Sequence, residues 1–309
     1  MTFISYAQNF EDVILWRALK HIENGFYIDA GAWSPDEDSI TRAFYERGWR
    51  GINIEPNPAW IDKLRERRPE DINLPYALGD KEETVDLYVA VDTTGLSTVE
   101  PEYAKKNEED GQSIQTIPCQ AVTLNTVWDH HVGERQVHFL KIDVEGAEEA
   151  VIRGNDWTKN RPWIIVIEST YPNSQVATHH HWEHHFLDAG YIHVYSDGLN
   201  RYYVAREKSD LISAFAYPPN IFDAFKISSH ALAEAEANSL SQKYRELSQQ
   251  HHELSQKYDA LEIQHLAAVQ ILSELIKTRI YRIVRKLKQW AWLEERIMGL
   301  AYFSKHNKS

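Results

Sequence analysis

The 309-residue sequence predicts an α/β domain, a sheet flanked by helices, followed by a long helical segment. Short apolar runs alternate with helical patterns up to about residue 225, and several runs are almost wholly apolar, as in strands buried on both faces. Glycine and proline are absent from residues 233–275, which indicates one long helix. We therefore expect a domain over residues 1–227, a coiled coil over 232–275 and a basic amphipathic helix over 276–303.

The strands of the sheet are expected where apolar residues run together. They are Phe26–Asp29, Gly51–Glu55, Asn73–Ala77, Val137–Asp143 and Trp163–Glu168. Helical patterns lie between them at Ile40–Arg47, Ala59–Glu66 and Glu148–Val151.

Two further pairs of strands are predicted outside this alternation. Tyr191–Tyr195 and Arg201–Ala205 are joined through Asp197-Gly198, which is typical of a hairpin and would close the sheet. Val85–Val91 and Ile114–Val122 form the second pair. The polar residues 100–115 that precede and enter its second strand predict a surface loop.

The helical segment after the domain carries a heptad repeat, visible in the runs LSQKYRE, LSQQHHE and LSQKYDA. One series of positions is mostly leucine: Leu240, Leu247, Leu254, Leu261, Ala268 and Leu275. The other series is mixed: Ala237, Tyr244, His251, Tyr258, His265 and Leu272. A heptad repeat of this length favours self-association in a coiled coil over a helix folded back on the domain. The tyrosines and histidines do not specify a dimer over a trimer.

The net charge of −13 argues against a general nucleic-acid binder, because phosphate contacts need a basic surface. The charge is divided unevenly: residues 275–309 carry nine Lys or Arg and two Glu, so they are at +7 while the rest of the chain is at −20. Apolar residues form one stripe in this basic part: Ile276, Ile280, Ile283, Val284, Leu287 and Ala291. Such a helix suits either an anionic membrane surface or the acidic surface of its own protein.

Neither a membrane span nor an export signal is expected. No uncharged apolar run of about 18 residues occurs, and Glu11 and Asp12 lie where the apolar part of a signal peptide would be. The single cysteine, Cys119, cannot form an intramolecular disulfide. We interpret the protein as cytoplasmic, with the basic helix as its one candidate for contact with the inner membrane face.

The segment with the clearest chemistry is Phe26–Trp33, a strand that runs into a turn at Gly31. A dinucleotide site would have three glycines there, whereas this turn has one glycine and the carboxylate of Asp29, which repels phosphate and suits a cation. The next strand ends in Glu55, which is suited to accept hydrogen bonds from ribose hydroxyls. This order of acid, glycine and acid predicts a pocket for S-adenosylmethionine.

Two later strand ends extend the same acidic rim. Asp80 could accept from the adenine amino group, and Asp143 could face the reactive end of the cofactor. Four acids in order at strand ends are hard to explain as turn residues alone, because carboxylates at a buried edge need partners.

These motifs resemble the FkbM family of S-adenosylmethionine-dependent methyltransferases. The resemblance covers about residues 3–225 and is carried by SYAQNFED, GFYIDAGA, RGWRGINIEP, YALGD, LKIDVEGAE, WIIVIE, DGLNRYYV and YPPNIFDAF. It implies a Rossmann-like class I methyltransferase sheet and O-methylation of glycans or natural products, often in surface-polysaccharide assembly. It also implies that the segment with Gln8 and Glu11 closes over the cofactor. The family usually has Asn where this chain has Trp33.

Removal of the hydroxyl proton needs a base or a metal ion. The resemblance points to His179 as general base, and Asp143 and Lys141 are the other catalytic candidates. A divalent ion held by Asp143 and Glu168 is the rival arrangement, and the sequence does not choose between them. His179–His185 contains two i,i+4 histidine pairs that could bind zinc, or is an incidental solvated cluster.

The acceptor contacts expected from the sequence are Ser97, Asp197, Asn200 and Arg201, all in turn or hairpin segments. The function expected is O-methylation of a sugar hydroxyl in surface-glycan biosynthesis. The alternatives are O-methylation of a small natural product, and a degenerate methyltransferase fold that works as a tethering protein through residues 233–303.

Overall fold

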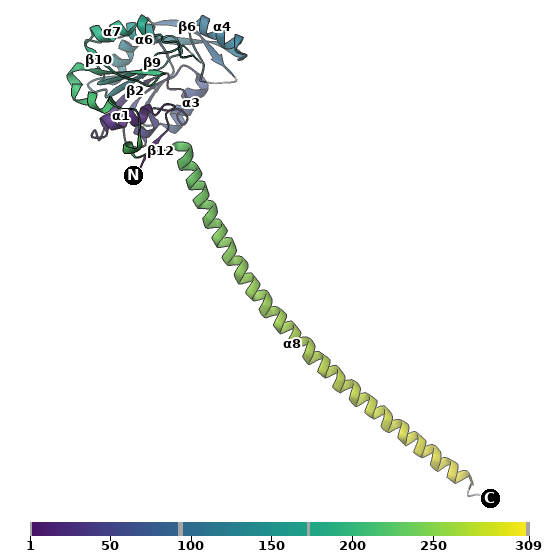
Figure 1. Ribbon diagram of the computed structural model, residues 1–309. Helices are drawn as coiled ribbons and strands as arrows, with labels where there is room; N and C mark the ends of the chain where they lie inside the picture. Colours follow the sequence, from purple (N-terminus) through teal and green to yellow (C-terminus); the bar gives the residue numbers. More distant parts are fainter. Residues whose placement is uncertain (1, 92–94, 172–173, 307–309) are drawn as a thin grey trace. The chain divides into compact units, whose positions relative to one another are not determined.

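The computed structural model describes residues 2–91, 95–171 and 174–306, with side chains up to residue 298 (Figure 1). The chain divides into two compact units between Leu232 and Ala233. The first unit is a mixed α/β body and the second is helical, so the predicted α/β class and the long C-terminal helix are confirmed.

The first unit is built on a seven-stranded sheet with the order β10-β11-β9-β8-β2-β3-β4. Its strands are β2 (Phe26–Ala30), β3 (Arg50–Ile54), β4 (Ile72–Leu74), β8 (Phe139–Ile142), β9 (Ile164–Glu168), β10 (Tyr191–Ser196) and β11 (Asn200–Ala205). Neighbours from β4 to β9 pair in parallel, while β11 is antiparallel to both β9 and β10. The carboxyl ends of β2, β3 and β8 therefore meet at one edge of the sheet.

Helices follow the strands, as the alternating pattern predicts. They are α1 (Glu11–Leu19), α2 (Arg42–Tyr45), α3 (Pro58–Arg67), α4 (Pro101–Glu109), α5 (Leu124–Val127), α6 (Glu148–Arg153) and α7 (Glu183–Asp188). Other helical segments, of 3₁₀ or π geometry, lie at Trp128–Val132, His179–His181, Arg206–Phe215 and Ile221–Asp223. The local sequence stabilises the beginning of α3. The Asn57 side chain accepts a hydrogen bond from Ala59 N, and Pro58 occupies the first helical position.

A second, three-stranded sheet holds β5 (Ala77–Gly79), β7 (Ile114–Thr123) and β6 (Glu83–Ala90), in that order. The predicted strand Asn73–Ala77 is thus divided between two sheets. Pro75 separates the two parts, and a proline has no N–H with which to continue the ladder of a strand.

The expectation of a surface loop at residues 100–115 is wrong for much of that segment. Pro101–Glu109 is the helix α4, which has a proline in its first turn and an i,i+4 ion pair between Lys105 and Glu109. These features stabilise a helix although the segment is polar.

Both faces of the main sheet are buried, and the side chains alternate between them. Ile28, Ile52 and Leu140 belong to the hydrophobic cluster on one face. Tyr27 and Phe139 belong to the cluster on the other. This double burial explains why the strands read as nearly continuous apolar runs.

The beginning and the end of the first unit lie side by side. β1 (Phe3–Ser5) pairs in parallel with β12 (Phe225–Ile227). Arg17 on α1 also binds the Asp223 carboxylate at 2.6 Å and the carbonyl oxygen of Tyr217 at 2.7 Å. The last segment of the unit therefore fixes the first helix.

The helix α8 begins at Ser228, near the end of the first unit, and ends at His306; its residues from Ala233 onward belong to the second unit. It is continuous through the junction at residues 275–276, where the sequence suggests two segments (Figure 1). Its leucines are exposed, for example Leu247 at 65% and Leu254 at 67%. Among the residues that the structure describes, no helix is both long enough and apolar enough to cross a membrane.

Candidate active site

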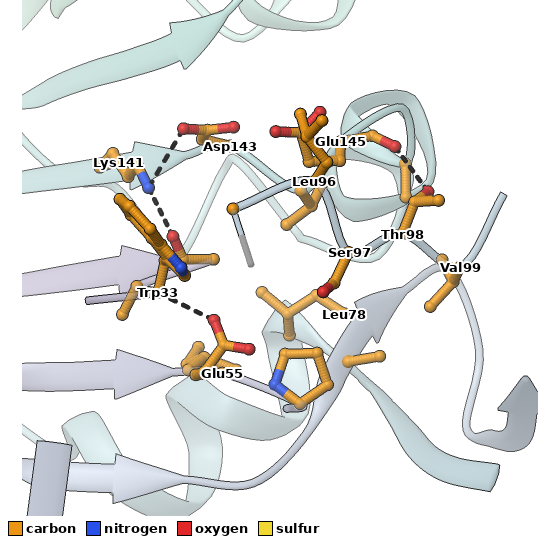
Figure 2. A pocket seen from close by; sticks show the side chains of 18 of the residues that line it. Trp33, Glu55, Leu78, Leu96, Ser97, Thr98, Val99, Lys141, Asp143 and Glu145 are labelled. Atoms are coloured by element: carbon orange, nitrogen blue, oxygen red, sulfur yellow. Dashed lines mark hydrogen bonds and ion pairs between the residues drawn. The ribbon is translucent and has the colours of Figure 1, made fainter. Parts of the chain in front are cut away.

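A cleft lies at the carboxyl ends of β2, β3 and β8 (Figure 2). Its volume is about 270 Å³. Of the residues singled out in the sequence, the cleft brings together Gln8, Glu11, Gly31, Glu55, Ser97, Lys141, Asp143 and Asn200. These come from segments far apart in the chain, and they meet because parallel strands end at the same edge.

Gly31 forms a tight turn directly after β2. Its φ is +78°, and a Cβ atom at this position would lie 1.7 Å from the carbonyl oxygen of Asp143. Its own carbonyl oxygen accepts a hydrogen bond from Lys141 Nζ at 2.5 Å. Both the backbone conformation and the close contact require glycine here.

Glu55 follows β3 and is held by two backbone donors. Its Oε2 accepts from Trp33 N at 2.9 Å and its Oε1 accepts from Asn57 N at 2.8 Å. The side chain is buried, and this burial raises the pKa of Glu55 to about 7 although the backbone donors oppose the shift. Glu55 thus presents a fixed carboxyl group to the cleft (Figure 2).

Lys141 joins two of the predicted acids. Its Nζ lies 3.5 Å from Asp29 Oδ1 and 3.3 Å from Asp143 Oδ2. Burial by itself lowers the pKa of Lys141, but the carboxylates of Asp143 and Asp29 outweigh it and raise the pKa above its ordinary value. Lys141 thus lies between two carboxylates and holds Asp143 beside the cleft.

Asp29 lies beneath the cleft and does not line it. Its Oδ2 accepts from the Thr41 hydroxyl at 2.9 Å, and only 2% of the residue is exposed. The Thr41 hydroxyl in turn accepts from Arg68 at 2.6 Å. Asp29 thus connects the Gly31 turn to the segment before α2. The sequence analysis expected Asp29 to contact the cofactor, but its side chain does not line the cleft.

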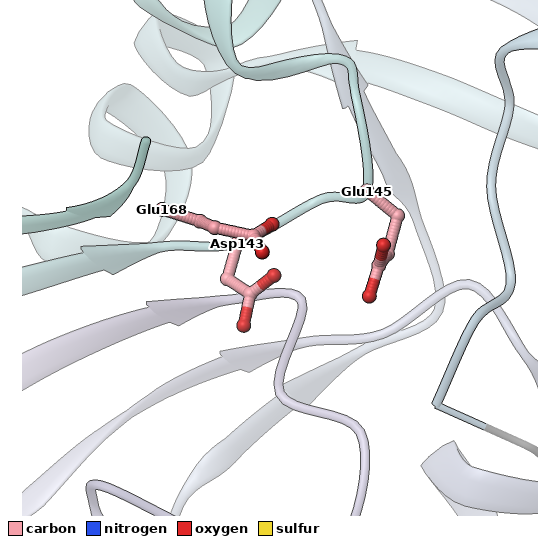
Figure 3. A group of neighbouring side chains, drawn as sticks. All are labelled: Asp143, Glu145 and Glu168. Carbon is pink, nitrogen blue, oxygen red and sulfur yellow. The ribbon is translucent and has the colours of Figure 1, made fainter. Parts of the chain in front are cut away.

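Three carboxylates meet at the ends of β8 and β9 (Figure 3). Asp143, Glu145 and Glu168 each offer an oxygen atom within 4.8 Å of the other two. Burial, followed by repulsion from Asp143 and Glu145, raises the pKa of Glu168 to about 11. Burial and the charge of Asp143 also raise the pKa of Glu145 well above its ordinary value. Like charges this close are stable only with an added proton or cation.

The segment before and at the start of α1 supplies another wall of the cleft. Glu11 Oε2 accepts from Asn9 N at 2.9 Å, and its Oε1 accepts from the Asn200 amide at 2.8 Å. Burial raises the pKa of Glu11 to about 8. Asp197 lies behind Asn200 and accepts from its backbone N–H at 2.6 Å, so it shapes the turn without lining the cleft.

Besides Asp29, Asp197 and Glu168, three more residues expected in the site do not line this cleft. Asp80 follows β5, outside the main sheet, and pairs with Arg153 at 3.2 Å. Arg201 pairs with Glu183 at 2.6 Å, and because side chains alternate along a strand it points away from the face to which Asn200 turns. His179 is in a helical turn beside these residues, where burial and the charge of Arg201 lower its pKa.

Among the described residues, the histidine run does not belong to a group of three or more ligand residues that could hold a metal ion, whereas the three carboxylates of Figure 3 form such a group. The sequence arguments also gave no role in the cleft to Trp33, which lines it and packs against Trp60. Trp33 has φ +44°, a backbone conformation that is unusual for a bulky residue. The sequence feature that could have placed Trp33 in the cleft is its position directly after the Gly31 turn.

The buried Glu148 was also missed as a site-forming residue. Its Oε1 accepts from Val144 N at 3.1 Å and Gly146 N at 3.2 Å, and so it holds the loop that carries Glu145. Burial raises the pKa of Glu148 to about 7.

A comparison with protein-family models matches residues 29–192 to the methyltransferase FkbM domain. The matched segment is more than half of the 309 residues, and it contains the Gly31 turn, Glu55 and all three clustered carboxylates. Among curated proteins, no significant match is found.

Proposed function

The chain belongs to the FkbM methyltransferase family, and on that premise we propose that it transfers the methyl group of S-adenosylmethionine to a sugar hydroxyl in surface-glycan biosynthesis. The observation that carries the cofactor assignment is the pair formed by the Gly31 turn and the Glu55 carboxyl group on neighbouring parallel strands. The strand order β4-β3-β2-β8-β9 supports a Rossmann-like sheet, whose ligands bind at the carboxyl ends of strands.

The residues of the cleft fit this cofactor. Glu55 offers a buried, oriented acceptor for the two ribose hydroxyls. The turn at Gly31 has no Cβ, so backbone lines the adjacent wall. Asp143 also lines the cleft, where a carboxylate favours the cationic end of the molecule over a phosphate. When bound, S-adenosylmethionine supplies a methyl group on a positively charged sulfur.

The protein's tasks are to align the acceptor hydroxyl and to take its proton. We assign the proton to Asp143, which lines the cleft with 37% of its side chain exposed. Lys141 holds that carboxylate from 3.3 Å. Asp143 Oδ would accept the proton of the hydroxyl whose oxygen receives the methyl group, and S-adenosylhomocysteine would be released as the other product. His179, outside the cleft, has no part in this step.

The acceptor is assigned as a neutral sugar. The cleft is lined by hydroxyl and amide groups, which bind sugars. Lys141 is the one basic residue among the described residues that line it, and it is already paired with Asp29 and Asp143, so the cleft offers no free cation to an anionic substrate. Ser97 Oγ is buried and has no hydrogen-bond partner among the described residues, so it can bind an acceptor hydroxyl. Asn200 lines the same space.

Calorimetric titration with S-adenosylhomocysteine, the product of the cofactor, tests the assignment. Micromolar binding supports it, and absence of binding in the presence and absence of added Mg²⁺ or Zn²⁺ refutes it. Methyl transfer to sugar acceptors is then measured before and after treatment with a chelator. If activity survives chelation, the repulsion among Asp143, Glu145 and Glu168 is relieved by bound protons. If activity returns only when a divalent ion is added, the repulsion is relieved by a metal ion.

We further propose that residues 232–275 of α8 self-associate through their heptad positions. The leucines are 54–69% exposed, and a lone helix has no core of its own to cover them. In a parallel pair, Lys257 of one copy faces Glu262 of the other, and like charges do not oppose one another along this stretch. Sedimentation equilibrium of the full chain measures this directly.

The tethering alternative rests on the same exposed heptads. It predicts that the chain assembles normally but binds no S-adenosylhomocysteine. The retention of Gly31, Glu55 and Asp143 in one cleft favours the enzyme.

A further inference from the structure

The segment 276–293 of α8 is chemically different from the rest of the helix. It contains six cations and no acidic residue: Lys277, Arg279, Arg282, Arg285, Lys286 and Lys288. It also contains an apolar stripe that is left uncovered, with exposed fractions of 55% at Ile280, 58% at Ile283 and 62% at Leu287. Concentrated positive charge beside exposed apolar surface is what an interface between water and anionic lipid attracts.

The arrangement of these residues around the helix is ordered. At about 100° per residue, the apolar side chains from Ile276 to Trp290 fall within an arc of about 120°. Lys277 and Lys288 flank one side of that arc, and Arg279 and Lys286 flank the other. Cations at both margins can keep their charged ends among lipid headgroups while the stripe enters the acyl boundary.

The stripe is not a continuation of the heptad repeat that precedes it. In that register the next two core positions after Leu275 are Arg279 and Arg282. The apolar stripe is displaced from them by one residue, about 100° around the helix. Two copies that paired along the displaced stripe would bring Lys277, Arg279 and Lys286 close to like charges, so a second copy is a poor partner for it.

We propose that residues 276–293 of α8 bind anionic lipid bilayers, lying in the plane of the interface with the Ile280–Leu287 face inward. Charge complementarity selects the anionic surface. Trp290, which is 71% exposed at the end of the stripe, is a residue type that settles at the headgroup level. A nucleic acid would use the cations but would leave the apolar face uncovered.

Flotation of the full-length protein with vesicles tests the proposal. The vesicles are phosphatidylcholine alone or phosphatidylcholine with phosphatidylglycerol, at low and high salt. Binding is expected only to the anionic vesicles, and it weakens as salt screens the charges. No binding to anionic vesicles at low salt, or equal binding to both compositions, overturns the proposal.

A charge variant and its matched control separate this segment from general electrostatics. Lys277→Gln/Arg279→Gln/Lys286→Gln is expected to weaken binding about 100-fold, at about five-fold for each cation. The control, Lys159→Gln/Lys243→Gln/Arg245→Gln, removes the same charge outside the segment, leaves Lys257 and its partner Glu262 in place, and should bind like the unaltered protein. Equal weakening in both variants overturns the proposal.

The apolar face is tested independently with Ile280→Ser/Ile283→Ser, which keeps every charge. This variant should also lose vesicle binding, while its helical circular dichroism and its sedimentation mass stay unchanged. If it binds anionic vesicles normally and the charge variant does not, the segment is a general polyanion site and the lipid assignment is wrong. If the variant instead has a lower mass in sedimentation equilibrium, the apolar face is a contact between two copies of the chain, and the lipid assignment is wrong.

Discussion

Glu55 makes the cofactor proposal testable through pH. Its pKa of about 7 lies far above that of an exposed glutamate because the side chain is buried. Ribose hydroxyls donate to the carboxyl group, so they bind its ionised form better. Affinity for S-adenosylhomocysteine should therefore rise with pH up to about 7 and level off above it.

The size of this effect follows from the ionised fraction. A group of pKa about 7 is about one-tenth ionised at pH 6 and about nine-tenths ionised at pH 8, which predicts an approximately tenfold gain in affinity between them. Glu55→Gln keeps the shape but removes the charge. It loses about 1.5–3 kcal/mol for a hydrogen bond to a charged group, or about 10–150-fold in affinity.

Isothermal titration calorimetry from pH 6 to pH 8 measures both quantities. The Glu55→Gln variant should show weak binding with little slope against pH. Glu11, whose pKa is about 8, lines the same cleft, so Glu11→Gln is measured to subtract its contribution. Asp80→Asn is the matched control, because Asp80 lies outside the cleft and should leave affinity unchanged. Tight, pH-independent binding by Glu55→Gln would refute the reasoning.

Three other predictions concern the Gly31 turn, the pair of Lys141 and Asp29, and the heptad repeat of α8. Gly31→Ala should abolish cofactor binding and lower the melting temperature, because its Cβ would meet the carbonyl oxygen of Asp143 at 1.7 Å; unchanged melting and binding would contradict this contact. Lys141→Met leaves the buried Asp29 without its cation and should reduce the free energy of unfolding by about 3–5 kcal/mol in urea titration; the double variant with Asp29→Asn should recover part of the loss, and no recovery would show that the pair is not the cause. Leu254→Lys should reduce the mass seen by sedimentation equilibrium while S-adenosylhomocysteine binding persists; an unchanged mass would remove this heptad position from the interface.

Much of the cleft could be foreseen from strand ends. Glu55 and Asp143 each follow an apolar run, and parallel strands bring such ends together. The same reasoning misplaced Asp80, because Pro75 ends one strand and the chain then enters a different sheet. Which sheet a short apolar run joins depends on its partners, and these are far away in the sequence.

Orientation and charge state were beyond the reach of sequence patterns. Asn200 and Arg201 are neighbours in the chain, yet only Asn200 lines the cleft, because β11 fixes which residue faces which side. The sequence offers Lys141 as a catalytic candidate, but it does not show that its ammonium group lies between the carboxylates of Asp29 and Asp143. The raised pKa of Glu168 likewise arises from burial and from neighbours that only the fold assembles.

The pairing of β1 with β12 has a consequence for synthesis of the protein. Phe3–Ser5 pairs with Phe225–Ile227, and Arg17 binds Asp223. These contacts can form only after almost the whole unit has left the ribosome. Contacts this distant in sequence slow folding. A nascent chain that stops before residue 223 lacks these two contacts and must hold α1 through the packing of Ile14 and Leu15 in the core and through the hydrogen bond between Glu11 and Asn200.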